Sequence, residues 1–308
     1  MKQTIIFLSP MPPFDFNLTA AYATYFQGQY AADHFHHGIY RRLLNLRDKL
    51  YLINVRSVGS VETPSLEVAL KGRALSEHSV FEVRNQVARL LGIDQELKPF
   101  YKMALKDTAL GPLVQSLRGL HIPQALSLWE VLVLAIIGQQ VSSQLARIMR
   151  NLLVQTFGLA LEESGVTYNI FPRPEALVKA GVDGLRSLKL GKKKAQYIFR
   201  IAATLASKER DLENLRSLPD DEVISKLTEI RGVGPWTANW LLIRGLGRPD
   251  AFPYGDLALR RTMKALLHDD SLLQPKEALN YSYRWSPFRS YATAYLFAAM
   301  RSGRFSLG

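Results

Sequence analysis

Apolar residues follow a helical spacing through most of the chain beyond about residue 98. The longest apolar run, 131–137, is preceded by Ser127 and Glu130, which form the spacing of a capping box. After a break at Gly138, helical spacing resumes over 141–156. A further helix is predicted within 188–206, whereas 158–174 is expected to be a loop-like connection.

The first 98 residues show shorter segments with a different period. Runs at 4–8, 51–58 and 65–70 are β-rich or alternate between apolar and polar residues, which predicts strands. Residues 79–91 carry apolar positions at helical spacing. We therefore expect a small mixed α/β domain containing an antiparallel sheet over 1–98, followed by an all-helical domain over 99–308.

Two short helices are predicted on either side of a glycine-rich hairpin. Residues 220–230 read as the first helix, and Pro235, directly after Gly232 and Gly234, suits the first position of the second. The start of a helix leaves backbone N–H groups without internal partners, and these can bind an anion.

The charge of the chain suggests which anion that is. The 308 residues carry a formal net charge of +12 with a pI of about 9.8, and basic residues are in excess around the hairpin. A basic protein of this kind favours a polyanionic partner, so we expect the anion to be a DNA phosphate. The lysines at 192–194 are expected to be a solvated helix end, with a further phosphate contact as the alternative.

Several classes of protein are made unlikely by the composition. The chain has no cysteine, which excludes disulfides, a cysteine-ligated iron–sulfur cluster and thiolate zinc. No apolar run reaches membrane-spanning length, and the N-terminus lacks the pattern of a signal peptide. His34, His36 and His37 beside Asp33 could bind a metal, but the simpler expectation is a solvated surface.

Asp256 is the main candidate for chemistry. It follows Gly255 and precedes a predicted helix over 257–267, so it fits a helix N-cap. A carboxylate there could also act on a substrate, and the two roles are compatible because a helix N-terminus favours the ionised form.

Three motifs resemble the helix-hairpin-helix DNA glycosylases, and in particular the 3-methyladenine DNA glycosylase II family. They are Gly-Val-Gly-Pro-Trp-Thr-Ala at 232–238, Trp-Ser-Pro-Phe-Arg-Ser-Tyr-Ala at 285–292 and Pro-Pro-Phe-Asp-Phe at 12–16. The resemblance implies an α+β fold in which the helical domain forms two subdomains on either side of an active-site cleft.

The resemblance also implies roles for individual residues. Asp256 matches the catalytic aspartate. The residues matched to the substrate-base pocket are Trp236, Trp240 and Phe297, with Tyr22 as a further wall. Those matched to DNA contacts are Gly232, Gly234, Thr237, Ala238, Gln139 and Gln140, of which the two glutamines are expected to enter the duplex. The backbone carbonyls of Thr228, Ile230 and Val233 match a site for a monovalent cation, Na⁺ or K⁺.

The implied activity is that of a monofunctional DNA glycosylase that removes alkylated purines from double-stranded DNA and leaves an abasic site. Trp236 stands where oxidised-base members of the superfamily carry a nucleophilic lysine, and tryptophan cannot form a Schiff base. The alternatives are a non-catalytic DNA-binding module and a glycosylase for oxidised or deaminated bases. We expect no required cofactor, a monomer, and a location in the cytoplasm with the nucleoid, or in the nucleus of a eukaryote.

Overall fold

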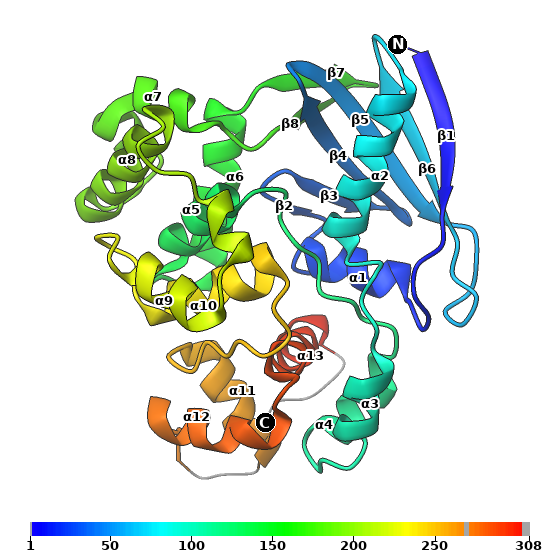
Figure 1. The fold of residues 1–308 in the computed structure, drawn as a ribbon, viewed down its shortest axis with the longest axis vertical. Coiled ribbons are helices and arrows are strands. Elements are labelled where there is room, and N and C mark those ends of the chain that lie inside the picture. Colours follow the sequence, from blue (N-terminus) through cyan, green and yellow to red (C-terminus); the bar gives the residue numbers. More distant parts are fainter. Residues whose placement is uncertain (1, 268–270, 304–308) are drawn as a thin grey trace.

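The computed structural model describes residues 2–267 and 271–303, and its N-terminal part is a six-stranded antiparallel sheet (Figure 1). The strands are β1 (Lys2–Leu8), β2 (Gln29–Tyr30), β3 (Asp33–His36), β4 (Ile39–Leu46), β5 (Lys49–Ser57) and β6 (Leu66–Gly72). Their order across the sheet is β1-β6-β5-β4-β3-β2. The strands expected at 4–8, 51–58 and 65–70 are confirmed, whereas β2, β3 and β4 had not been predicted.

One face of the sheet is covered by helices. Leu66, Val68 and Leu70 alternate with less buried neighbours along β6, and they share a core with residues of α2 (Glu77–Leu91). The helix α1 (Phe16–Ala23) packs on α2, β3 and β5. The core of the sheet is distinct from the core of the helices, and we therefore propose to treat 1–98 and 99–308 as two domains.

From residue 128 to residue 246 most of the chain is helical. The elements are α5 (Leu128–Gly138), α6 (Ser143–Phe157), α7 (Pro174–Ser187), α8 (Lys192–Ala206), the 3₁₀ turn η1 (Glu213–Ser217), α9 (Asp220–Thr228), α10 (Pro235–Leu241) and the π turn η2 (Leu242–Leu246). In this group α10 contacts both α9 and α5, and α8 packs on α7. The two helices predicted around the glycine hairpin are α9 and α10.

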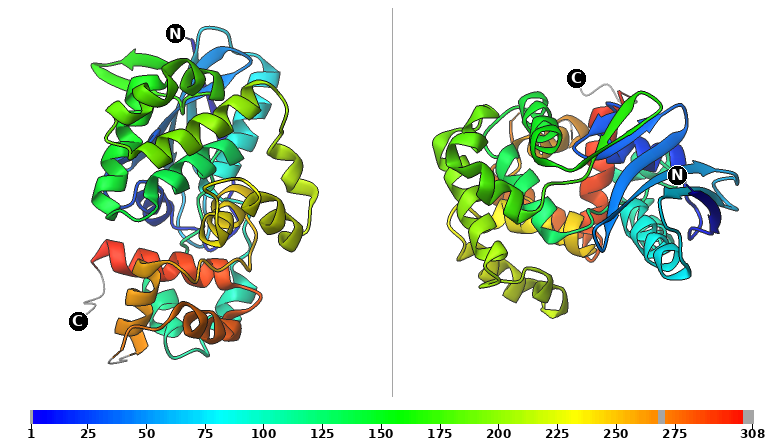
Figure 2. Two further views of the ribbon diagram at one scale, coloured as in Figure 1. Left: turned by 90° about the vertical axis from the view of Figure 1, so that its left-hand side faces the viewer. Right: turned by 90° about the horizontal axis from the view of Figure 1, so that it is seen from above.

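A second helical group combines segments from far apart in the sequence. Its elements are α3 (Lys98–Ala104), α4 (Leu110–Ser116), α11 (Leu257–Leu267), α12 (Pro275–Ser282), the 3₁₀ turn η3 (Tyr283–Trp285) and α13 (Arg289–Ser302). The last helix, α13, packs on both α4 and α11, and Figures 1 and 2 show the group below the other helices. The chain therefore visits this group twice, once before α5 and once after α10.

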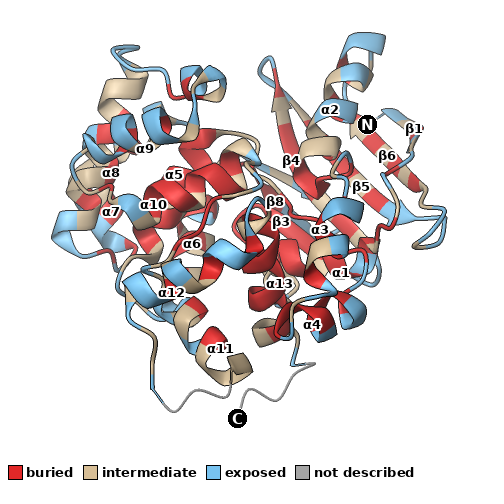
Figure 3. Ribbon diagram, turned by 60° about the horizontal axis from the view of Figure 1, so that its bottom comes forward, coloured by how far each residue is buried: buried red, intermediate tan, exposed pale blue. Residues whose placement is uncertain are grey.

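The helices α5 and α13 lie in the core of the protein. Every residue from 290 to 299 in α13 is buried, and α5 is buried along most of its length (Figure 3). A helix that is apolar around its circumference belongs in a core rather than at a surface.

The segment 158–174 is not the loop that the sequence suggested. It contains a hairpin of β7 (Ala160–Glu163) and β8 (Val166–Asn169), joined through Ser164 and Gly165, which both have positive φ. Tyr168 and Ile170 pack against Leu43 and Leu52 of the sheet. The hairpin forms because it covers the second face of β4 and β5, which a local pattern cannot reveal.

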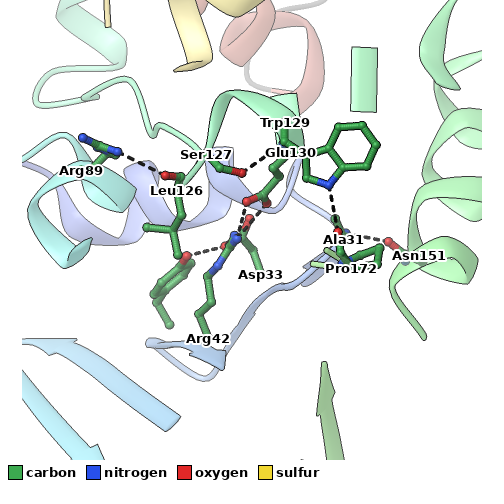
Figure 4. Close-up of polar contacts among 11 residues, drawn as sticks. Ala31, Asp33, Arg42, Arg89, Leu126, Ser127, Trp129, Glu130, Asn151 and Pro172 are labelled. Atoms are coloured by element: carbon green, nitrogen blue, oxygen red, sulfur yellow. Dashed lines mark hydrogen bonds and ion pairs between the residues drawn. The ribbon is translucent and has the colours of Figure 1, made fainter. Parts of the chain in front are cut away.

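A buried network of charges joins the sheet to α5 (Figure 4). Arg42 on β4 donates to both carboxylate oxygens of Glu130 at 2.7 Å and to Asp33 at 2.7 Å. Ser127 caps α5 by accepting the Glu130 N–H at 3.2 Å. The predicted capping box is thus only half formed, because the Glu130 side chain turns to Arg42 instead of the helix end.

The histidine cluster differs from the simple surface that was expected. His34 is buried and has its ring edge-on to Tyr168, whereas His36 and His37 are exposed. Within residues 2–267 and 271–303, no group of three or more His, Asp or Glu residues is arranged to hold a metal ion. In the same ranges, no helix combines the length and the apolar character needed to cross a membrane.

Candidate active site

A cleft of about 1000 Å³ lies where the sheet domain and the two helical groups meet. Its walls come from the loop after α1, the turn between α5 and α6, α10, the start of α11 and the end of α13. The lining includes Tyr25, Tyr30, Gln139, Gln140, Arg150, Trp236, Thr237, Trp240, Arg244, Asp256, Leu257, Arg261, Phe297 and Arg301. Among the described lining residues, Asp256 carries the one carboxylate.

Asp256 is held by hydrogen bonds to both of its carboxylate oxygens. Oδ1 accepts the N–H groups of Ala258 at 2.9 Å and Leu259 at 3.1 Å, which is the geometry of an N-cap on α11. Oδ2 accepts the indole N–H of Trp236 at 2.9 Å. The carboxylate is half-buried and fixed at the cleft wall. Asp256 therefore caps α11 and lines the open cleft at the same time.

Three of the predicted pocket aromatics form a continuous wall. Trp236 and Trp240 are four residues apart on α10, with ring centroids 6.4 Å apart and planes at 74°. Phe297 on α13 lies 5.4 Å from Trp240, with an angle of 50° between the ring planes. All three side chains line the cleft.

The fourth predicted aromatic, Tyr22, does not line the cleft. Its ring is 1% exposed and packs edge-on against Phe26. The N-terminal domain contributes Tyr25 and Tyr30 instead, whose rings stack at 3.9 Å with planes at 18°. Tyr25 has a φ of +56°, an uncommon conformation for a residue other than glycine, and this turn belongs to the cleft wall.

Arginine side chains gather beside these two tyrosines. The guanidinium of Arg301 lies 3.9 Å from the Tyr25 ring centroid and 4.6 Å from that of Phe297, and Arg150 lies 5.3 Å from Tyr30. Burial opposes ionisation of the Tyr25 hydroxyl, but the nearby positive charges, that of Arg301 above all, lower the pKa of Tyr25 to about 8. The back of the cleft is therefore electropositive.

The hairpin between α9 and α10 contains two glycines, Gly232 and Gly234, and they differ in backbone conformation and in the space around them. Gly232 has a φ of +95°, and a Cβ there would lie 2.3 Å from the Tyr197 ring. Gly234 has a φ of −110°, and a Cβ there would meet nothing within 4 Å. The fold therefore requires glycine at 232 and leaves open space at 234.

One predicted DNA contact at the hairpin conflicts with the hydrogen bonding. The Ala238 N–H donates to the Gly234 carbonyl at 3.0 Å as the first internal bond of α10. It is therefore not free to bind a phosphate, whereas Trp236 and Thr237 precede that bond in the helix. The sequence contained the signal for this, because Pro235 at the first helical position makes Ala238 the fourth residue, whose N–H is the first with an acceptor inside the helix.

The two glutamines of the α5–α6 turn both line the cleft but differ in their surroundings. The Gln139 amide nitrogen donates to the Gly232 carbonyl at 2.9 Å and to the Thr237 hydroxyl at 3.0 Å, so this side chain braces the hairpin. Gln140 is exposed, with a φ of +53°. The structure thus leaves Gln140 accessible to a duplex and engages Gln139 within the protein, contrary to its expected insertion.

Lys194 supports the same turn from α8. Its ammonium donates to the carbonyl of Ile137 at 2.9 Å and to that of Gln139, both at the end of α5. Burial lowers the pKa of Lys194, with Arg150 adding to the effect. This member of the lysine triplet therefore has a structural partner, and the solvated helix end that was expected does not describe it.

Comparison with known protein families supports a functional role for this cleft. The model of the HhH-GPD superfamily of base excision DNA repair proteins matches residues 133–287, a span that contains the hairpin, both α10 tryptophans and Asp256. The chain belongs to this superfamily. A DNA-3-methyladenine glycosylase of Bacillus subtilis is 33% identical over 219 residues, which cover 71% of this chain and 72% of that protein.

Solved structures show the same fold over nearly the whole chain. A 3-methyladenine DNA glycosylase from Archaeoglobus fulgidus has a TM-score of 0.83 at 26% identity, covering 96% of this chain and 98% of that one. An 8-oxoguanine glycosylase/lyase of Clostridium acetobutylicum in complex with double-stranded DNA has a TM-score of 0.76 at 20% identity, covering 98% and 99%. This second likeness concerns the fold alone.

The electropositive side of the cleft was not predicted from the sequence. Arg301 lies four residues after Phe297 on one helix, so their common face was a usable signal. Tyr25, Tyr30, Arg150 and Arg244 come from separate elements that only the tertiary fold brings together. Their grouping could not be read from spacing.

Proposed function

We propose that this protein is a monofunctional DNA glycosylase that hydrolyses the glycosidic bond of damaged purines, with alkylated purines of the 3-methyladenine type as the main substrates. The observation that carries this proposal is the Asp256 carboxylate, fixed by Trp236 and α11 at the wall of an aromatic cleft. The relatives named for the same activity support it. A simple DNA-binding module needs neither the cleft nor a fixed carboxylate.

The chemistry requires little more than one well-placed anion. Once a nucleotide is flipped from the stack, the bond between C1′ and the base breaks, and its electron pair leaves with the base. The sugar then carries positive charge, which the Asp256 carboxylate stabilises electrostatically. A water oxygen bonds to C1′, and Asp256 orients that water and accepts or relays its proton. The product is an abasic site.

Trp236 supports a monofunctional reaction over a glycosylase/lyase. A lyase needs an amine to attack C1′ and form a Schiff base. The indole nitrogen of Trp236 is not such a nucleophile, and its N–H is used in the bond to Asp256. An oxidised-base glycosylase/lyase is therefore the less favoured alternative.

The DNA is proposed to approach the hairpin and the Gln140 side of the cleft. The amides near Gly232 and Gly234 would bind backbone phosphates without reading sequence, and Gln140 would fill the space that the flipped nucleotide leaves. The Gln139 side chain would hold this surface in place. We propose that the protein acts as a monomer.

A monovalent cation at the hairpin fits the donor set that this chain offers. The carbonyls of Thr228, Ile230 and Val233 would hold it. The Ile230 carbonyl accepts the Val233 N–H at 2.9 Å, but a carbonyl oxygen has a second lone pair. The ion would add positive charge to the amides that face the phosphate. No cofactor is proposed for the reaction itself.

The proposal is tested with duplexes that each contain one damaged base. Released base is identified by mass, and parallel samples are treated with borohydride. We expect free alkylated purine, intact abasic strands and no trapped protein–DNA adduct. A trapped adduct would contradict the monofunctional reaction, and the absence of any released base would contradict the enzymatic one.

A further inference from the structure

The strand β1 forms one edge of the six-stranded sheet. The strand order places it at the opposite end from β2, which contributes Tyr30 to the cleft (Figure 1). Among the residues that the structure describes, β6 is its one strand partner, along the whole length from Lys2 to Leu8. Proteins usually protect such an edge with proline or charge, but neither interrupts residues 3–8. The second side of β1 is therefore open to another strand.

The pairing shows which backbone groups of β1 point outward. The Val58 N–H donates to the Ser65 carbonyl at 2.9 Å, and bonded pairs alternate along an antiparallel ladder. This bond sets the phase of the β5–β6 ladder and hence of the β6–β1 ladder. In that phase Ile5 and Phe7 turn their N–H and C=O groups away from β6. The Phe7 carbonyl accordingly accepts Nη1 of Arg84 at 3.0 Å.

Exposed apolar side chains flank this edge on both faces of the sheet. Ile6 is buried in the core that includes α2, so Ile5 and Phe7, which are 49% and 57% exposed, lie on the opposite face. On the α2 side, a groove of about 420 Å³ is lined by residues of β1 and α2, among them Phe81, which is 61% exposed. An added strand alternates its side chains between the two faces, so both sets would meet apolar surface.

The charges around the edge favour an acidic occupant. Lys2, Arg84 and Arg73, which directly follows the Gly72 partner of Lys2, are exposed. In residues 2–267 and 271–303, none of these three forms an ion pair. Glu77 is the one carboxylate in the described lining of the groove. A second copy of the chain would bring the same basic groups to the same place, because a twofold interface pairs a surface with itself. Carboxylates beside an apolar run are complementary instead.

From these observations we propose that β1 and its groove with α2 bind an extended segment of a partner protein, apolar in its centre and acidic at its ends, which pairs with β1 as an additional strand of the sheet. The inference goes beyond the proposed glycosylase function and does not depend on it. Because β1 and the cleft strand β2 lie at opposite edges of the sheet, DNA in the cleft would leave the β1 edge accessible.

The test uses the full chain and a fluorescein-labelled peptide, Glu-Asp-Val-Phe-Ile-Thr-Val-Asp-Glu. Fluorescence anisotropy should show saturable binding, and hydrogen exchange should slow at the amides of residues 2–8 in the complex. One control peptide carries lysine at each acidic position. The other carries N-methyl groups at alternate residues, which remove the donors that an added strand needs. Each control should bind about tenfold or more weakly, because it lacks either the charge or the backbone bonds.

Two substitutions test the two sides of the site. Ile5→Pro removes an outward N–H without removing a bond to β6, and proline is accepted on an edge strand. Phe81→Ser removes the exposed ring from the groove and keeps the test valid if the proline variant does not fold. Each should weaken peptide binding by about tenfold or more. The matched control is Leu105→Ser, because Leu105 follows α3 and is 54% exposed, and its affinity should stay within about twofold.

Three results would overturn the inference. One is the absence of saturable binding of the acidic peptide up to about 1 mM. Another is equal binding of either control peptide, which would show adhesion without the proposed charge or strand pairing. The third is a dimer in sedimentation equilibrium that Ile5→Pro or Phe81→Ser dissociates, which would assign the edge to a second copy of the chain.

Discussion

The indole N–H of Trp236 donates to Oδ2 of Asp256 at 2.9 Å, across the 20 residues that separate them in the chain. Trp236 lies in the first turn of α10, after the glycine hairpin, and Asp256 caps α11. The bond therefore couples the proposed DNA-binding hairpin to the proposed catalytic carboxylate, so that the position of one fixes the position of the other.

Replacing Trp236 by phenylalanine tests this coupling. The ring remains in the wall, but the carboxylate loses one of its donors, and single-turnover base release should slow on the order of tenfold or more. Trp285→Phe is the control, because Trp285 donates to Asp107 Oδ2 at 3.0 Å away from the cleft lining. An unchanged rate in Trp236→Phe would show that the hydrogen bond does not position Asp256 for the reaction.

The two hairpin glycines should respond differently to substitution. Gly234→Asp adds a side chain in open space and a favourable N-cap, so stability should change by no more than about 0.5 kcal/mol, while affinity for duplexes of any sequence falls through repulsion of phosphate. Gly232→Ala should cost about 1–3 kcal/mol in urea unfolding, because it combines a positive φ with contact against Tyr197. Undiminished binding by Gly234→Asp would remove the phosphate role.

Tyr25 should ionise at an unusually low pH. Its pKa of about 8 lies below the ordinary value of 10.0, so an absorbance titration should show a phenolate near pH 8 that is absent in Tyr25→Phe. The midpoint should move to higher pH in Arg301→Met. Because the folded protein favours the ionised form, the unfolding free energy should rise between pH 8 and pH 10 and lose this contribution as pH falls through 8. A titration without any ionisation near pH 8 would contradict the electropositive environment.

The Arg42 network should matter for stability. Arg42→Met leaves Glu130 and Asp33 as buried carboxylates without their cation, and unfolding free energy should fall by about 3–5 kcal/mol. The loss should be partly recovered in the double variant Arg42→Met with Glu130→Leu, because one of the unpaired charges is then removed. If Arg42→Met were as stable as the unmodified protein, the network would make no net contribution to the free energy of unfolding.

Local patterns predicted the parts of the molecule that local chemistry decides. Glycine and proline at 232–235 marked the hairpin and the start of α10, and the position of Asp256 before an apolar stripe marked the start of α11. The four-residue spacing of Trp236 and Trp240 was enough to put both on one face.

Features that depend on distant partners were not predicted. The strands β7 and β8 form against the outer face of the sheet, and Glu130 turns from its helix cap because Arg42 lies beside it. Gln139 points inward because the Gly232 carbonyl and the Thr237 hydroxyl offer it acceptors. A glutamine at position 139 is compatible with a side chain that points into the protein or toward solvent, so the residue type did not decide between the two.

The central claim is that the Asp256 carboxylate carries the reaction, and Asp256→Asn tests it most directly. Asparagine also caps helices, so α11 and the fold should be retained, and binding to abasic-site DNA should persist. Single-turnover release of an alkylated purine should fall by on the order of 10²- to 10³-fold, because the charge that stabilises the sugar cation is gone. Release at the unmodified rate, with the fold intact, would contradict the account.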